Sequence, residues 1–590
     1  MDPESFYQSV LNKYTLEEKN LGKKINILSL FRLASMILFV LFLVQGVRHD
    51  SLLFYLLSLI SFISFFLFVA FYKKLTEERR KKNILKKINQ QELEALTGSY
   101  HNFNDGARFL DPDHEFTYDL DIFGPYSLFQ YICRCCTLSG EQVLATRFLK
   151  SPVNKADILN HQQIHEELSK NPGFMQNYLA SGHMIDEKPG EIQQIKNWLG
   201  NSGTGLKTWI HLAALILAIA NISLAIAALL FSGWVNYLIF SILISWFFYG
   251  IFFNRINHYH SQFGKKQEII RKYNTLSRVM AASAFNHSFL SQAAVKTNRS
   301  LKQFKKLETL MDIFDSRLNL LVGVILNTIF LLDFHLIKRL ENWKTNNASL
   351  LLEIVKLHGE TDAYISGAIF RFNHPDYVWA QPDNETFSAR MLGHPLIKPG
   401  ECITNNFTLK NQEKIIIITG ANMAGKSTFL RTLGTNLILA GAGFPVYAEE
   451  FRFRPQAVIT GMRTTDSLAE STSYFFAELK RMKKIMDRLR NGEKLFVLLD
   501  EILKGTNSKD KHKGSEELMK QFVDFNCNVF IATHDLGLAN LEKSFPDHIK
   551  NYHFESYIKN DELYFDYKIK EGKARNMNAS FLLRKMGVLK

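Results

Sequence analysis

The sequence predicts two kinds of structure in one chain. One is an α/β domain with a mostly parallel sheet near the C-terminal end, and the other is an all-α core that carries two transmembrane helical hairpins. Three observations lead to this prediction. A Gly-rich loop joins an apolar strand to a helix, a second apolar strand ends in two carboxylates, and four charge-poor segments of about twenty residues come in two pairs.

Composition bounds the class of protein. The 590 residues are enough for about three or four domains. The net charge of +14 suits an anionic partner, either nucleic acid or the anionic face of a membrane, and charge alone does not choose between them. Of the five cysteines, Cys133, Cys135 and Cys136 lie together, whereas Cys402 and Cys527 are far away. This spacing predicts neither a disulfide framework nor a metal site, but free thiols in a reducing compartment.

The first predicted hairpin covers residues 27–71. Apolar segments run over residues 27–47 and 52–71 and are separated by a short polar turn. Each is long enough to cross a hydrocarbon layer of roughly 30 Å, and Arg32, near the start of the first, can extend its charged head toward the lipid headgroups. Because the first segment begins late and a second follows at once, no cleavable signal peptide is expected.

The second predicted hairpin covers residues 207–254, with apolar segments over residues 209–231 and 235–253. Basic residues flank both hairpins: Lys23 and Lys24 before the first, Lys73, Lys74, Arg79, Arg80, Lys81, Lys82, Lys86 and Lys87 after it, and Arg255, Lys265, Lys266, Arg271 and Lys272 after the second. By the positive-inside rule, the soluble parts face the cytoplasm and the chain is a multi-pass protein of the inner or plasma membrane. The alternative is that these segments are buried helices of a large soluble core. A further apolar run over residues 318–332 is short and holds Asn319 and Asn327, so it predicts a buried helix rather than a fifth span.

The Gly-rich loop over residues 420–428 fits the phosphate-loop pattern G-x-x-x-x-G-K-[ST]. It follows an apolar strand over residues 415–418 and precedes a helical stretch over residues 428–439. In such a loop the backbone N–H groups point at phosphate oxygens, a lysine neutralises the β and γ phosphates, and a hydroxyl binds Mg²⁺. The predicted ATP-binding residues are Gly420, Ala421, Asn422, Met423, Ala424, Gly425, Lys426, Ser427 and Thr428.

Two further strands complete a hydrolytic site. The strand over residues 495–500 ends in Asp500, which can hold Mg²⁺ together with Ser427, and is followed by Glu501, which can orient or deprotonate the attacking water. A strand over residues 528–533 leads into His534, which can contact the γ phosphate. With Lys426 as a further catalytic residue, the sequence predicts a Mg²⁺-dependent ATPase.

These segments resemble a known family. Residues 420–431, 498–506 and 532–536 look like the ATPase domain of MutS proteins, the ATPases of DNA mismatch repair. Asn422 and Met423 in the loop separate this pattern from that of other phosphate-loop ATPases. The resemblance implies an α/β P-loop ATPase domain of the ABC-like MutS type, with an all-α lever core.

The resemblance also implies a homodimer with composite ATP sites. Ser473, within the segment 466–478, would reach the γ phosphate in the partner's site, and residues 576–587 would form a helix for dimer contact. His394, in the His-Pro turn over residues 392–395, would lie near the base of the nucleotide.

Weaker resemblance over residues 121–152 and 318–382, to the start of the family's helical core and to the return of its levers, gives a domain plan. It consists of a cytoplasmic segment 1–26, hairpin 27–71, first core part 72–206, hairpin 207–254, lever helices 255–385, and ATPase domain 386–590 with its dimerisation helix.

The sequence departs from complete MutS mismatch sensors in several places. Such sensors begin with a domain carrying a Phe-x-Glu motif, which residues 1–26 do not contain, and the second hairpin falls where clamp-bearing levers would be expected. Asp535 stands where the family commonly has an aromatic residue, and Ala424 replaces a usual glycine, which is tolerable if its φ stays negative.

Two functions therefore remain open. One is a MutS-family ATPase that couples hydrolysis to binding of DNA, including mismatched DNA, at the membrane. The other is a membrane-tethered remodelling ATPase with no role in mismatch repair. The basic stretches over residues 296–306 and 480–490 fit DNA phosphates or a solvated helix face equally well. An ABC exporter half is disfavoured, because the signature-like residues 138–142 precede the phosphate loop instead of lying between the two nucleotide motifs.

Overall fold

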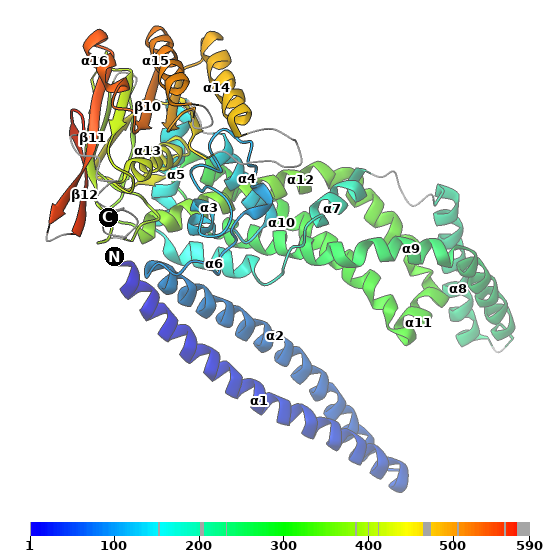
Figure 1. The fold of residues 1–590 in the computed structure, drawn as a ribbon. Helices are drawn as coiled ribbons and strands as arrows, with labels where there is room; N and C mark the ends of the chain where they lie inside the picture. The colour runs from blue at the N-terminus through cyan, green and yellow to red at the C-terminus, as the bar shows by residue number, and fades with distance from the viewer. Residues whose placement is uncertain are drawn as a thin grey trace. The chain divides into compact units, whose positions relative to one another are not determined.

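The computed structural model describes residues 2–150, 154–200, 206–231, 233–383, 386–398, 400–410, 412–463, 474–503, 507–559 and 562–574. The chain divides into two compact units. The helical unit consists of Met1–Glu92, Cys135–Gly140 and Gly173–Asp362, and the mixed unit consists of Leu93–Arg134, Glu141–Pro172 and Ala363–Lys590. All strands of the described residues belong to the mixed unit (Figure 1).

A six-stranded sheet forms the centre of the mixed unit. Its order is β12-β11-β5-β10-β9-β8, and all neighbouring pairs are parallel except β11–β12. The strands are β5 (Ile415–Thr419), β8 (Ala457–Gly461), β9 (Leu495–Asp500), β10 (Cys527–Thr533), β11 (Ile549–Lys559) and β12 (Glu562–Glu571). Because β5, β9 and β10 are covered on both faces, they are continuous apolar runs rather than alternating ones. The predicted mostly parallel sheet is confirmed.

Smaller sheets stand beside the central one. A four-stranded sheet has the order β2-β7-β3-β4, and β1 pairs with β6. These strands are β1 (Val378–Trp379), β2 (Gln381–Pro382), β3 (Phe387–Leu392), β4 (Asn405–Leu409), β6 (Pro445–Val446) and β7 (Glu450–Phe453). Asn405 joins the four-stranded sheet to the central one, because its amide donates to Tyr567 O at 3.0 Å and accepts from Ile569 N at 2.8 Å.

Helices cover both faces of the central sheet. The helices of the mixed unit are η1 (Ala107–Phe109), α3 (Leu128–Ile132), α4 (Leu138–Leu149), α5 (Lys155–Ser169), α13 (Lys426–Gly441), α14 (Tyr474–Arg490), α15 (Ser508–Asp524), η3 (Leu538–Asn540) and α16 (Leu541–Ser544). Successive side chains of a strand point to opposite faces of the sheet, so neighbouring residues pack against different helices. Leu498 meets α13 at Gly434, while Val497 and Leu499 join the cluster under α14 and α15.

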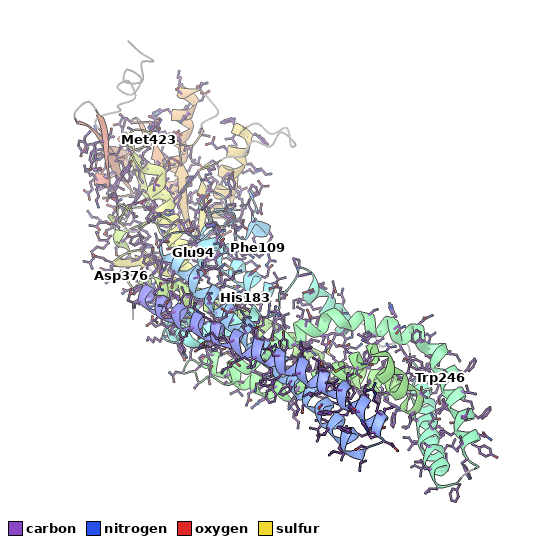
Figure 2. All side chains as sticks on the ribbon, turned by 90° about the horizontal axis from the view of Figure 1, so that it is seen from below. Glu94, Phe109, His183, Trp246, Asp376 and Met423 are labelled. Atoms are coloured by element: carbon purple, nitrogen blue, oxygen red, sulfur yellow. The ribbon has the colours of Figure 1, made fainter. Side chains whose placement is uncertain are left out.

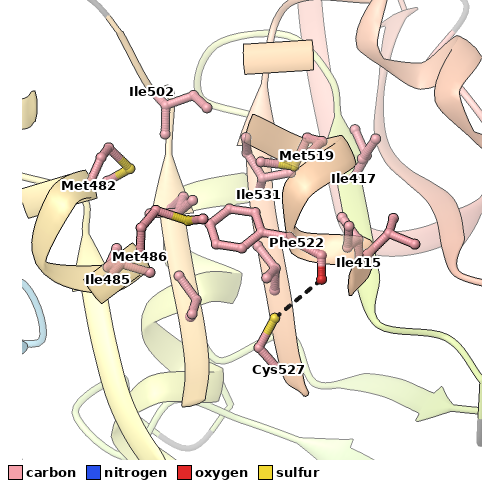
Figure 3. Close-up of a cluster of buried hydrophobic side chains, with 14 of the residues drawn as sticks. Ile415, Ile417, Met482, Ile485, Met486, Ile502, Met519, Phe522, Cys527 and Ile531 are labelled. Carbon is pink, nitrogen blue, oxygen red and sulfur yellow. Dashed lines mark hydrogen bonds between the residues drawn. The ribbon is translucent and has the colours of Figure 1, made fainter. Parts of the chain in front are cut away.

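That cluster is the core of one sheet face (Figure 3). Its buried members include Ile415, Ile417, Met482, Ile485, Met486, Ile502, Met519, Phe522, Cys527 and Ile531. The Cys527 thiol lies 3.6 Å from Phe522 O, and burial raises its pKa to about 12, so it behaves as an apolar side chain with a weak donor. The five cysteines, all among the described residues, form no disulfide with one another.

The described part of the helical unit consists of helices, several of which are long. They are α1 (Pro3–His49), α2 (Leu52–Leu96), α6 (Pro172–Gly182), α7 (Glu191–Gly200), α8 (Thr208–Leu230), α9 (Val235–Ala281), α10 (Ser288–Asp315), η2 (Ser316–Leu318), α11 (Leu320–Phe330) and α12 (Leu332–Asn373). Four of them, α1, α2, α8 and α9, are long and apolar enough to cross a membrane. In α1, α2 and α9 the apolar stretch predicted from sequence is only one part of the helix.

Helices α1 and α2 form an antiparallel pair. Phe39 and Phe62 pack with ring centroids 4.9 Å apart, and Ser58 Oγ donates to Phe39 O at 3.2 Å. Beyond the apolar stretch, Arg79 pairs with Glu18 at 2.7 Å. Contacts are therefore apolar where the helices are apolar, and ionic where they are polar.

The short apolar helix α11 differs from its prediction. It packs against α8 and α9 with Asn327 buried, but Val324 is 47% exposed and Phe330 is 40% exposed. The prediction of a buried helix over residues 318–332 therefore holds only in part, because α11 covers fewer residues, buries Asn327 and leaves Val324 and Phe330 exposed.

Candidate functional site

The Gly-rich loop connects β5 to α13 through a backbone that requires glycine. Gly420 has φ +149°, and a Cβ placed there would lie 2.6 Å from Phe554 O. Gly425 has φ +104°, and Met423 takes a positive φ of 66°. Ala424 is not among the residues with positive φ, so its replacement of a glycine fits the backbone. The loop curls as the phosphate-loop pattern predicts.

The side chain of Lys426 bonds to backbone carbonyl groups of this loop. It is the first residue of α13, and its buried Nζ donates to Gly420 O at 2.9 Å and to Ala421 O at 2.8 Å. Burial lowers the pKa of Lys426, while the nearby carboxylates Asp500 and Glu501 raise it. The helix N-terminus and the ammonium together give the loop a positive potential suited to an anion.

The ends of β9 and β10 bring the predicted catalytic side chains together. Glu501 follows β9 with φ +55°, and its N–H donates to Ala532 O of β10 at 2.9 Å. His534 follows β10, and its Nε2 lies 2.6 Å from Glu501 Oε1 and 3.4 Å from Lys426 Nζ. Parallel neighbours end at the same edge of a sheet, so residues far apart in sequence meet there.

A cavity of about 660 Å³ lies over this edge. Residues from the loop, the carboxylates, the His-Pro turn and the last two strands line it: Leu392, His394, Ile397, Glu401, Cys402, Ile403, Asn405, Asn422, Met423, Gly425, Lys426, Ser427, Thr428, Phe429, Thr432, Asp500, Glu501, His534, Phe554 and Tyr567. Ser427 and Asp500 thus contribute a hydroxyl and a carboxylate to one space, the oxygen ligands that Mg²⁺ prefers.

Charged and apolar side chains both line the cavity. Lys426, Asp500, Glu501 and Glu401 are charged. Leu392 and Ile397 contribute apolar surface, and Tyr567 lies beside Gly425 of the loop. His394 lies in the wall, and burial lowers its pKa to about 4, so the imidazole is neutral near pH 7. Its Nδ1 accepts from Leu396 N at 3.2 Å.

Several residues at or near the cavity belong to no sequence motif. Phe554 and Tyr567 come from β11 and β12, and only the sheet order places them beside the loop. The buried carboxylate of Glu478 in α14 accepts from Leu503 N, which anchors the segment after β9. In the sequence, Glu478 is one charged residue among many in a polar helix, so its buried position is only weakly indicated.

Asp535, which departs from the family pattern, has a local structural role. Its Oδ2 lies 2.6 Å from His512 Nδ1 of α15, and its Oδ1 accepts from Gly537 N at 2.8 Å. These contacts fix the loop that carries His534.

The other predicted loop residues differ in exposure. Asn422, Met423 and Thr428 line the cavity and are exposed, and Met423, labelled in Figure 2, is 77% exposed. Ala421 is buried. Ser473, residues 504–506 and residues 576–587 lie outside the described residues.

Residues 416–583 match the model of a protein family described as MutS domain V. This part of the chain is similar to the MutS family. The matched segment contains the loop, both carboxylates, His534, Phe554 and Tyr567, whereas His394 precedes it. Most of the residues that line the cavity thus lie within the matched segment.

Individual MutS proteins are similar to about a third of the chain. The DNA mismatch repair protein MutS of Thermotoga sp. (strain RQ2) is 32% identical over 178 residues, 30% of this chain and 22% of that protein. MutS of Thermotoga maritima is 31% identical over 202 residues, 33% of this chain and 25% of that protein. MutS protein homolog 4 of Mus musculus is 29% identical over 214 residues, 34% of this chain and 22% of that protein. The chain spans a quarter or less of the length of these relatives.

Proposed function

We propose that this chain, as a MutS-family ATPase, binds ATP with Mg²⁺ in the cavity over β5, β9 and β10 and hydrolyses it. The convergence of Lys426, Glu501 and His534 at one sheet edge supports the proposal most directly. A triphosphate would lie along the loop, where backbone N–H groups and Lys426 face its oxygens. The base would lie toward Tyr567 and the neutral His394.

Each residue then has a separate task. Ser427 and Asp500 would hold Mg²⁺, which neutralises charge on the phosphates. Glu501 would orient the attacking water and take its proton. His534 holds the Glu501 carboxylate in position and lies close enough to Lys426 to face the γ phosphate.

Turnover of ATP by the full chain, purified in detergent, tests this proposal. Lys426→Ala should abolish nucleotide binding, because it removes the cation from the loop. Lys543→Ala is the matched control, since Lys543 is exposed and does not line the cavity. Equal turnover by wild type and Lys426→Ala would refute the proposal.

Dimerisation and DNA binding form a second part of the proposal. Relatives named as DNA mismatch repair proteins favour a homodimer that couples ATP hydrolysis to DNA, with Ser473 completing the partner's site. The four long apolar helices favour a location in the inner or plasma membrane, with the mixed unit in the cytoplasm. They also favour the alternative of a membrane-tethered remodelling ATPase without a role in mismatch repair.

DNA-stimulated turnover separates these alternatives. A DNA-coupled ATPase should respond to duplex, and its response should weaken steeply with salt because phosphate contacts release counterions. A stronger response to mismatched than to matched duplex would add mismatch recognition. No response to either duplex would leave the membrane-tethered alternative.

A further inference from the structure

We propose that α11 and the start of α12 enter the membrane as a re-entrant hairpin, so that the chain turns from one long helix to the next inside the hydrocarbon layer. This inference rests on the proposed membrane location of α8 and α9. Helix α11 has eleven residues, about 16 Å of helix, which is half of a 30 Å hydrocarbon layer. It is too short to span the membrane and has the length of a half-span.

Positions along α9 indicate depth in the hydrocarbon layer, because the apolar stretch of α9 ends near Phe253. Before α11, Arg317 donates to Asn257 Oδ1 at 2.8 Å, just beyond that end, and to Tyr249 OH at 3.2 Å, four residues inside it. Near the end of α11, Thr328 Oγ1 accepts from Trp246 Nε1 at 2.7 Å. Trp246 lies seven residues inside Phe253, about 10 Å along the helix. The chain therefore descends along α9 from Arg317 to Thr328.

Helix α12 returns along α9 toward the end of the apolar stretch. Asp333 Oδ2 accepts from Tyr249 OH at 2.7 Å, and Glu341 Oε1 accepts from Tyr259 OH at 2.6 Å. Helix α8 gives the same order, since Asn221 meets Thr328 and His211 meets Phe334. On both α8 and α9 the deepest of these contacts is made by Thr328, three residues before the helix break at Leu331.

A helix break inside hydrocarbon requires that its free backbone groups find partners within the protein. Leu331 has φ +43°, which ends α11. The buried Asn221 of α8 donates to Thr328 O at 3.2 Å and to Ile329 O at 3.3 Å, carbonyls in the last turn of α11. Asn327 Oδ1 accepts from Asp333 N at 3.0 Å, at the start of α12. Both sides of the break are thus capped by side-chain amides.

The polar groups around this break are also partnered. Asn221 accepts from Ser241 Oγ at 2.6 Å and donates to Ser245 Oγ at 3.0 Å, and all three side chains are buried. Arg317 pairs with Asp333 at 3.1 Å, and both side chains are buried. Polar and charged groups at membrane depth are tolerated when they face the protein and pair in this way.

The exposed side chains of α11 have the chemistry of a lipid contact. Val324 and Phe330 are exposed on either side of the buried Asn327, and α11 contains no charged residue. Helices α8 and α9 also expose apolar side chains, such as Ile226 and Leu243. Because α11 packs on both helices, lipid acyl chains are the occupant that fits the exposed apolar side chains of all three.

Photolabelling with a phospholipid that carries a diazirine in its acyl chain tests this inference. The full chain is placed in vesicles, irradiated and mapped by peptide mass spectrometry. Adducts are expected on α8, on α9 and on the α11 peptide with Val324 and Phe330. Val295 of α10 is equally apolar and 48% exposed, lies outside the proposed hairpin and should stay unlabelled.

The outcomes separate the two proposals. Adducts on α8 and α9 without adducts on α11 would overturn the re-entrant hairpin and leave the membrane location intact; cross-links from α11 to a second copy would overturn it as well. Absence of adducts from all three helices would overturn the membrane location itself.

In a second experiment, Asn221→Leu should lower the labelling of α11 while α8 stays labelled. The same change at the exposed Asn236 of α9 should leave both unchanged. Unaltered α11 labelling in Asn221→Leu would refute the capping role.

Discussion

The imidazole Nε2 of His534 lies 2.6 Å from Glu501 Oε1, and the two residues come from the ends of neighbouring parallel strands. Both side chains are about a quarter exposed, at 28% and 25%, so the pair opens onto the cavity. His534 also lies 3.4 Å from Lys426 Nζ. One imidazole therefore links the proposed water-activating carboxylate to the lysine of the phosphate loop.

Glu501→Gln should separate binding from hydrolysis. The amide keeps the shape of the side chain but cannot take a proton, so kcat should fall by roughly 10²- to 10⁴-fold. Nucleotide affinity should stay near that of wild type, because Lys426 and the loop are untouched. Steady-state turnover and the Kd of a fluorescent ATP analogue measure the two effects; a large loss of affinity would contradict the assigned role.

His534→Asn should lower kcat more than it changes KM. A hydrogen bond to a charged group contributes about 1.5–3 kcal/mol, so loss of the contact to Glu501 predicts a fall in kcat of roughly 10- to 100-fold. The control is His548→Asn, since His548 bonds to Gln412 O and does not line the cavity. An effect confined to KM would indicate that His534 contributes to ground-state binding instead.

Gly420→Ala should disable the loop. The new Cβ would lie 2.6 Å from Phe554 O, and φ +149° is unfavourable for alanine, so the loop must shift. Gly492 has φ +82°, and a Cβ placed there would have no atom within 4 Å, so Gly492→Ala should cost only backbone strain of about 1 kcal/mol. Nucleotide binding and thermal unfolding of both variants check the prediction. Similar behaviour of the two variants would show that the contact with Phe554 is unimportant.

His358 should make the stability of the helical unit depend on pH. Its Nδ1 lies 2.9 Å from Tyr178 OH and its Nε2 lies 2.9 Å from Ser277 Oγ, and burial lowers its pKa from 6.5 to about 3. The unfolded state then binds more protons between these values, so the free energy of unfolding falls as pH drops from 6.5 toward 3. The loss attributable to His358 is on the order of 4 kcal/mol over this window.

Thermal unfolding, followed by helical circular dichroism at a series of pH values below 6.5, measures this slope. His358→Gln should make it shallower, because glutamine does not titrate while His183, whose pKa burial lowers to about 4, still does. His548→Gln, a change outside the helical unit, should keep the wild-type slope. An unchanged slope in His358→Gln would place the titration elsewhere.

Local patterns predicted much of the fold and of the site. The β-branched run before Gly420 forms β5, the run before Asp500 forms β9, and the run before His534 forms β10. In each case the signal lies within about ten neighbouring residues, because strand burial and loop curvature depend on local side chains and on glycine. The four long apolar helices were predictable for the same reason.

Other features depended on tertiary packing. The burial of Glu478 against Leu503 N could not be predicted, because nothing near either residue indicates the other. For α11, composition predicted an apolar helix but not its half-exposed position, which the amide caps of Asn221 and Asn327 stabilise. A hydrogen bond across about a hundred residues leaves no periodicity in either segment.

By itself the sequence determined the phosphate loop, the two carboxylates, the histidine and the long apolar helices, since each depends on residues adjacent in the chain. Only the tertiary structure decided that Phe554 and Tyr567 border the loop, that His534 pairs with Glu501 at 2.6 Å, and that the chain turns at Leu331 between capping amides. Strand order and helix packing set these relationships. Both arise from the burial of apolar surface over the whole chain rather than from any local pattern.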